Sequence, residues 1–189
     1  MKLLLDTHAW LWWVLDAPQL SARAKAAIAD PGNDVFVSAA SAWEIATKQR
    51  LGKLSGVPQA LERWAELAAL DGFVQLPVDY RHALLAGSYA QEHRDPFNRM
   101  LAAQSQIESL TLVTLDPAFA LFGTATVWSM CRSVASGRVL APDSASAQRF
   151  KSAHQISASA AFPSATTSVA SLRSRVASRP RFARASPRR

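Results

Sequence analysis

The chain has 189 residues, 49% of them hydrophobic, which is enough for one ordinary domain with a tail or at most two small domains. Its single cysteine, Cys131, excludes an intramolecular disulfide and fits a reducing compartment. The formal charge of +7 divides unevenly, because residues 1–128 carry a net charge of −3 and residues 129–189 a net charge of +10.

The N-terminus resembles a secretory signal only superficially. Lys2 and three leucines are followed by Asp6 and His8, which interrupt the apolar run, and no clean cleavage site follows. The longest apolar run, 9–15, is far shorter than the roughly 20 residues that a transmembrane helix needs. We therefore expect a soluble cytoplasmic protein without a membrane partner.

Short apolar runs alternate with helical patterns along the first 128 residues. The runs predict strands at 2–5, 35–38, 73–78 and 111–114, with a short last one near 126–128. The helical patterns lie at 9–15, 20–29, 41–51, 58–70, 80–91 and 96–108. This alternation predicts an α/β fold with three layers, α/β/α, around a central and mainly parallel sheet.

The first helical pattern contains three tryptophans, Trp10, Trp12 and Trp13. Neighbouring residues on a helix point apart, so the three cannot all face one core. We expect one of them to be exposed on a surface that binds a protein partner or a second copy of the chain.

Residues 129–189 differ in character from the rest. They contain 14 serines and ten arginines with one acid, and their apolar residues show no lasting periodicity. Such a segment buries too little apolar surface to offset the entropy lost on ordering, so we expect a disordered tail. Two interpretations stay open: a basic arm that binds the phosphates of RNA or DNA, or an appendage without selected function, which a frameshift soon after Trp128 would explain.

Several acidic and amide side chains fall at strand ends or helix starts: Asp6, Glu44, Asp95 with Asn98, and Asp116. Each has a structural alternative. Asp6 can cap the helix that follows it, residues 41–44 match a capping box, and Asp95 and Asp116 each precede a proline in the manner of an N-cap. Parallel strands, however, end at one edge of their sheet, where these side chains would crowd into one cleft.

Crowded carboxylates repel one another, so a cluster persists at neutral pH only by protonation or by binding a cation. Oxygen ligands without a cluster of histidine or cysteine suit Mg²⁺, with Mn²⁺ as the other candidate. Such a cation would let the site accept a phosphodiester and would activate a water. The chemistry predicted from these residues is metal-dependent hydrolysis of a phosphodiester.

Four motifs occur in order: LLLDTHAW around Asp6, VSAASAWEIA around Glu44, HRDPFNRMLAAQ around Asp95 and Asn98, and LVTLDPAF around Asp116. Together they resemble the PIN-domain ribonucleases of the VapC toxin type, over residues 1–128. The resemblance implies a small α/β/α fold, Mg²⁺-dependent endoribonuclease activity on RNA, a homodimer and a cognate antitoxin that inhibits the toxin.

By motif match, Asp6, Glu44 and Asp116 correspond to the metal-site acids of that family, and Asp95 is an extra acid of the His-Arg-Asp-Pro variant. The family usually carries aspartate where this chain has Asn98. An amide oxygen can coordinate Mg²⁺, but it brings no negative charge, so metal affinity should fall. Asp95 lies one helical turn from Asn98 and can partly compensate.

Other polar residues have both a structural and a functional interpretation. His8, Arg94 and Arg99 are candidates for contacts with the substrate phosphates, although His8 can also be an ordinary polar residue and Arg99 can pair with an acid. The cations at positions 48, 50 and 53 either favour a helix C-terminus or form a basic rim that guides RNA.

Other protein classes fit less well. A haloacid-dehalogenase-like phosphatase needs a second acid where His8 stands, and a dinucleotide-binding domain needs a glycine-rich turn after the first strand. A non-enzymatic protein is the stronger alternative: with Asn98 weakening the site, the chain would bind RNA or an antitoxin without cutting.

Overall fold

The computed structural model describes residues 1–54 and 62–128. Its centre is a five-stranded sheet in the order β3-β2-β1-β4-β5. The strands are β1 (Lys2–Leu5), β2 (Asp34–Ser38), β3 (Val74–Leu76), β4 (Thr111–Val113) and β5 (Thr126–Val127). All four strand pairings are parallel, so the carboxyl ends of the strands share one edge. The predicted parallel α/β sheet is confirmed.

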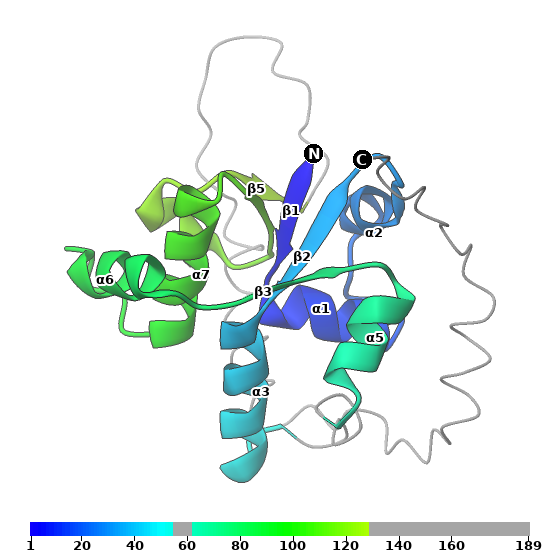
Figure 1. Cartoon of the computed structure of the whole chain (residues 1–189), viewed down its shortest axis with the longest axis horizontal. Coiled ribbons are helices and arrows are strands. Elements are labelled where there is room, and N and C mark those ends of the chain that lie inside the picture. The colour runs from blue at the N-terminus through cyan, green and yellow to red at the C-terminus, as the bar shows by residue number, and fades with distance from the viewer. Residues whose placement is uncertain (55–61, 129–189) are drawn as a thin grey trace, which may run out of the picture.

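Helices cover both faces of the sheet (Figure 1). In the described residues they are α1 (Thr7–Val14), α2 (Ala22–Ala29), α3 (Ala39–Arg50), α5 (Trp64–Leu70), α6 (Tyr80–Ser88) and α7 (Pro96–Ile107), with a 3₁₀ helix η1 (Pro117–Phe122). Helices α1, α2 and α5 lie on one side of the sheet, and α6 and α7 lie on the other (Figure 1). This arrangement has the three predicted layers.

The alternation of side chains along β1 produces the two cores. Leu3 and Leu5 belong to a cluster with α1, α2 and α5, whereas Leu4 points to the opposite face and packs with Leu101 of α7 and Phe119 of η1. All three leucines of β1 are fully buried, as expected for a strand covered on both faces. The central strand is thereby fixed from both sides.

Three helices begin within four residues of the end of a strand. β1 ends at Leu5 and α1 starts at Thr7, which leaves Asp6 between them. β2 ends at Ser38 and α3 starts at Ala39. β4 ends at Val113, and Asp116 stands at the start of η1. These tight junctions bring Asp6 and Asp116 to the carboxyl edge of neighbouring strands.

Element boundaries differ from the sequence predictions by a few residues. Strand β3 is shorter than the predicted 73–78, α6 ends three residues before the predicted 91, and α1 begins two residues before the predicted 9. The predicted helix 58–70 is described only from residue 62, where α5 forms its last part. The predicted disordered tail lies outside the described residues.

The expectation of an exposed tryptophan in α1 is wrong. Trp10 is fully buried with its ring 4.2 Å from that of Trp64, Trp13 is buried against Phe73, and Trp12 is half-buried against Trp128. The three point apart as predicted, but Trp64 of α5, Phe73 after it and Trp128 each cover one of them. The exposed tryptophan of the described residues is Trp43, on α3.

Among the described residues, no helix is long and apolar enough to cross a membrane.

Candidate active site

Asp6 occupies the N-cap position of α1 but does not cap the helix. Its side chain accepts no hydrogen bond from the first turn of α1. Instead, its Oδ2 accepts a hydrogen bond of 2.9 Å from Oγ1 of Thr114, which follows the neighbouring strand β4. The residue is only 5% exposed. The carboxylate is thus directed across the sheet edge rather than along its own helix.

The surroundings of Asp6 disfavour its charged form. Burial raises the pKa of the Asp6 carboxyl above its ordinary value, and the charges of Glu44 and Asp116 raise that pKa further. His8 and the hydrogen bond from Thr114 act in the opposite direction. Asp6 therefore feels the negative charge of two other candidate acids.

Glu44 lies in the middle of the second turn of α3 rather than in a capping box. Ser38 caps this helix by accepting a hydrogen bond from the Ala40 amide, so the predicted box at 41–44 is wrong: the helix begins two residues earlier than expected. The buried Glu44 accepts a hydrogen bond of 2.6 Å from Oγ1 of Thr7. Its other oxygen lies 2.5 Å from the Lys48 ammonium, one turn further along α3.

Asp116 both caps η1 and contacts Asn98. Its Oδ1 accepts a hydrogen bond of 2.8 Å from the Ala118 amide, which confirms the predicted N-cap. Its Oδ2 accepts one of 2.8 Å from Nδ2 of Asn98 on α7. The same Asn98 nitrogen lies 3.0 Å from Nε2 of His93. The amide of Asn98 thus turns its nitrogen, not its oxygen, toward Asp116.

Asp95 is the N-cap of α7, where its Oδ1 accepts a hydrogen bond of 2.9 Å from the Phe97 amide. It is not among the groups that shift the pKa of Asp6 in the described part of the chain. The structure therefore gives Asp95 the capping role, whereas Glu44 and Asp116 are the acids whose charges act on Asp6.

The three candidates for substrate contact have different surroundings. His8 and Arg94 are exposed. The guanidinium of Arg99 contacts five backbone carbonyls, those of Ala86, Gly87, Tyr89, Gln91 and His93. A guanidinium has five N–H donors, so these contacts occupy its donor capacity. Arg99 holds the connection between α6 and α7, and within residues 1–54 and 62–128 it forms no ion pair with an acid.

The donor set suits a divalent cation in chemistry but is not arranged as a cage. Residues 1–54 and 62–128 contain no group of three His, Cys, Asp or Glu side chains placed to hold a metal ion. Lys48 pairs with Glu44, and the Asn98 amide donates to Asp116, which neutralises part of the charge. A cation would relieve the repulsion that raises the pKa of Asp6. It would also require the Asn98 amide to present its oxygen.

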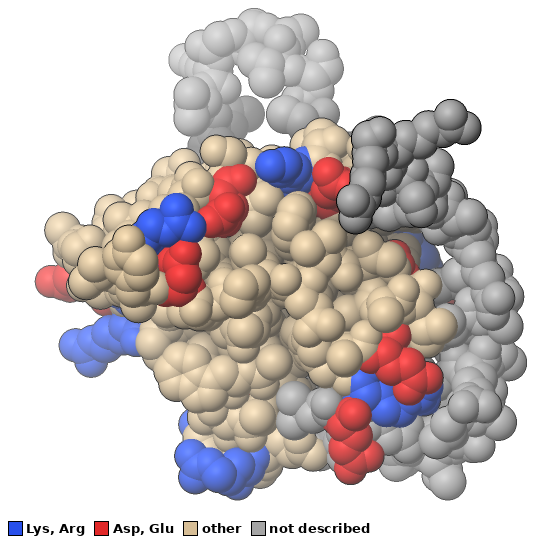
Figure 2. Space-filling model, in the orientation of Figure 1, with Lys and Arg blue, Asp and Glu red and all other residues tan. Residues whose placement is uncertain are grey.

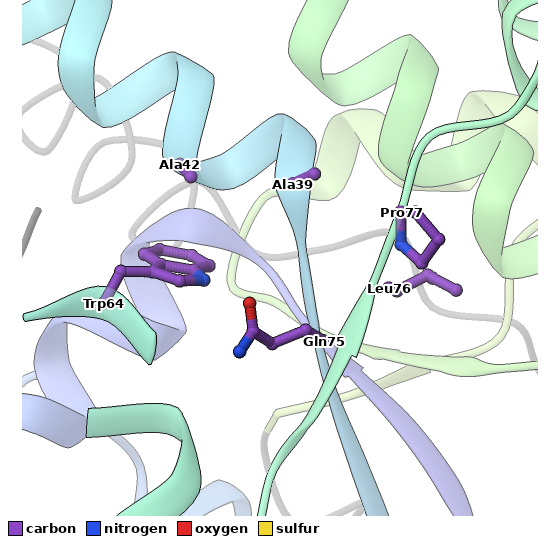
Figure 3. Close-up of a pocket in the computed structure, with 6 residues that line it drawn as sticks. All are labelled: Ala39, Ala42, Trp64, Gln75, Leu76 and Pro77. Atoms are coloured by element: carbon purple, nitrogen blue, oxygen red, sulfur yellow. The ribbon is translucent and has the colours of Figure 1, made fainter. Parts of the chain in front are cut away.

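An apolar pocket of about 340 Å³ lies on another side of α3 (Figure 3). It is lined by residues of α3, α5 and β3: Ala39, Ala42, Trp64, Gln75, Leu76 and Pro77. Figure 3 shows the indole of Trp64 and the amide of Gln75 facing the start of α3. None of the candidate acids lines this pocket, so it is separate from the acidic site.

The sequence model of the PIN domain family matches residues 3–124, which is most of the described chain. The chain belongs to the PIN-domain family. The match includes Asp6, Glu44, Asn98 and Asp116, so the family assignment agrees with the motifs in the sequence.

The chain is similar to two solved structures. One is a chain from the crystal structure of VapBC2 from Rickettsia felis bound to a DNA fragment from their promoter: identity is 14%, the TM-score is 0.51, and the match covers 68% of this chain and 100% of that one. Another is a chain of FitAcB from Neisseria gonorrhoeae, with 26% identity, a TM-score of 0.48, and coverage of 66% and 95%. No curated protein sequence gives a significant match.

The site of this PIN domain includes residues that the sequence analysis did not single out. Thr7 and Thr114 donate hydrogen bonds to Glu44 and Asp6, and Lys48 pairs with Glu44, which neither its helix C-terminus nor its rim interpretation included. A weak indication exists in the sequence, since Thr7 directly follows Asp6 and Thr114 lies two residues before Asp116. Their partners, 37 and 108 residues away, are defined only by the sheet order.

Proposed function

We propose that this PIN domain is a Mg²⁺-dependent endoribonuclease that hydrolyses RNA phosphodiester bonds. The observation that carries the proposal is the state of Asp6: a buried carboxylate, free of a capping role, whose pKa is raised by burial and by the charges of Glu44 and Asp116. Three ionised acids repel one another at such a site, and a bound cation relieves that repulsion. PIN domains are generally nucleases, which agrees with this chemistry.

We assign Asp6, Glu44 and Asp116 as metal-binding and catalytic acids, with Asn98 contributing its amide oxygen and Asp95 acting as an auxiliary acid. A bound Mg²⁺, or Mn²⁺ in its place, supplies Lewis acidity and neutralises the charge of the phosphodiester. Thr7 and Thr114 orient the carboxylates of Glu44 and Asp6. His8 and Arg94, both exposed, are available to contact the RNA backbone. We leave Arg99 out, because its donors are occupied.

We further propose that the nuclease is the toxin of a toxin–antitoxin pair, of the VapC type, and works as a cytoplasmic homodimer. The support is the set of four motifs around Asp6, Glu44, Asn98 and Asp116. The proposed catalytic unit is residues 1–128, and no step of the reaction is assigned to residues 129–189.

A second candidate function is RNA or antitoxin binding without cleavage. It is favoured by the hydrogen bond from the Asn98 amide to Asp116, which satisfies that carboxylate without a cation. In this case the fold is retained while the metal site is weakened.

Cleavage of a structured RNA pool by the full chain tests the first proposal. We expect fragments with Mg²⁺, none with chelator, and at least a hundredfold slower cleavage for Asp6→Asn. The matched control is Asp34→Asn, because Asp34 is an exposed aspartate at the opposite, amino-terminal end of the sheet, in register with Lys2. Cleavage that is insensitive to both the chelator and Asp6→Asn would refute the assignment. Activity that appears only in Asn98→Asp would support the second candidate.

A further inference from the structure

Trp43 is the exposed tryptophan of the described residues. It is 57% exposed, whereas the tryptophans at positions 10, 12, 13, 64 and 128 are buried or half-buried. Trp43 precedes Glu44 on α3, one of the two helices that flank the acidic site. Exposed apolar side chains are common, so exposure alone marks no site; what distinguishes Trp43 is its place on a helix that flanks the acidic site.

A second ring supports Trp43 from the other flanking helix. The ring of Phe97 packs edge-on against the indole, with 4.8 Å between ring centroids and 72° between ring planes. Phe97 precedes Asn98 on α7, and its amide is held by Asp95. Each ring of the pair is therefore the sequence neighbour of a residue in the acidic site. The indole is braced by a second ring and still accessible.

Residues 1–128 are mildly acidic, so their cations, Arg94 among them, attract the RNA backbone only weakly. The face drawn in Figure 2 carries its lysines and arginines in small separate groups, several beside an acid, and residues 1–128 have a net charge of −3. Proteins that bind single-stranded nucleic acid combine phosphate contacts with aromatic rings on which unpaired bases stack. A braced, exposed indole beside a phosphodiester-cleaving centre has the chemistry of such a stacking ring.

We propose that Trp43, supported by Phe97, stacks an unpaired nucleobase of the RNA whose phosphodiester enters the acidic site. This inference rests on the proposed ribonuclease function and specifies its substrate as single-stranded RNA or an unpaired loop. Bases inside a duplex are stacked on one another and are not available to the indole. Trp43 thereby selects unpaired RNA for binding, and the acids carry out the proposed hydrolysis.

The test measures binding without turnover. The full chain carrying Asp6→Asn is titrated, in chelator and at raised salt to suppress phosphate contacts, against a fluorescent single-stranded RNA and its duplex. We expect Trp43→Ala to weaken single-strand binding about tenfold and Trp43→Phe to restore most of it. Duplex binding should not change. Tyr80→Ala is the control, because Tyr80 is 74% exposed on α6, which contributes none of the acids.

Equal single-strand affinity with and without the Trp43 ring would overturn the proposal, as would no measurable binding by the parent. Cleavage by the unmodified chain is measured in parallel. Mg²⁺-dependent cleavage with unchanged binding in Trp43→Ala would refute the stacking role alone. No cleavage, with weakened binding in Trp43→Ala, would refute the nuclease while supporting the stacking role.

Discussion

The Asn98 amide donates a hydrogen bond of 2.8 Å to the Asp116 carboxylate, between α7 and the start of η1. The contact joins two of the proposed metal ligands through a proton, not through a cation. A carboxylate at position 98 would face Asp116 with a like charge, so this one residue decides how strongly the site needs a metal.

Asn98→Asp should therefore be less stable than the natural chain in chelator. Loss of the donor to Asp116 and the new repulsion should cost about 1–3 kcal/mol. Added Mg²⁺ should recover most of that loss and increase RNA cleavage. Thermal unfolding with and without Mg²⁺ measures the effect. Asn33→Asp serves as the control, and an equal Mg²⁺ response in both variants would contradict the prediction.

Asp6→Asn should stabilise the protein at neutral pH while abolishing cleavage. Burial raises the pKa of Asp6 above its ordinary value of 3.8, so the folded state disfavours the charged form. Stability is then lost as pH rises from the ordinary to the raised pKa, and the loss persists above it. The difference in free energy of unfolding between Asp6→Asn and the natural chain should grow over that same pH interval. Below it, the two free energies should be equal. Unfolding curves across pH that show Asp6→Asn destabilised at neutral pH would refute this.

Lys48→Met should destabilise the fold by up to about 3 kcal/mol, because it leaves the buried Glu44 carboxylate without its cation. This loss in free energy of unfolding should not exceed the loss measured when a fully buried ion pair is broken, since Lys48 is 29% exposed. Adding Glu44→Gln should recover most of the loss. Denaturant unfolding of the single and double variants measures this coupling. Lys53→Met, at an exposed position on the segment after α3, should have no effect.

Arg99→Lys should lose about 2–3 kcal/mol, because an ammonium cannot reproduce the guanidinium contacts with five carbonyls. Hydrogen exchange should become faster in residues 86–93 before the rest of the domain. Arg94→Lys, at an exposed position in the same segment, should leave both quantities unchanged. A similar stability loss in the two variants would show that the carbonyl contacts are not what holds this connection.

Trp10→Ala should cost about 3–5 kcal/mol, since it removes a fully buried indole that packs on Trp64. Trp43→Ala removes only an exposed indole and its edge contact with Phe97, and should cost no more than about 1.5 kcal/mol. Chemical denaturation of both variants compares them directly. A large loss for Trp43→Ala would mean that its indole is structural.

The sequence predicted the parallel sheet because its strands are short, apolar and separated by helical patterns, and β1 with its three leucines is the clearest case. The same pattern placed Asp6 and Asp116 after strands and Asp95 at a helix start. It could not show which acids cap helices and which face the site. Asp95 caps and Asp6 does not, and the difference depends on side-chain direction, which residue order does not encode. The cover over the α1 tryptophans depends on α5 and the residues after β5, which only the packed fold brings together.

The central claim is that Asp6, Glu44 and Asp116 form a divalent-cation site. Calorimetric titration of Mn²⁺ into the full chain, Asp6→Asn and Asp34→Asn tests it most directly. We predict saturable binding to the natural chain and to Asp34→Asn, and at least tenfold weaker binding to Asp6→Asn. Equal binding by all three proteins would place the cation elsewhere and contradict the account.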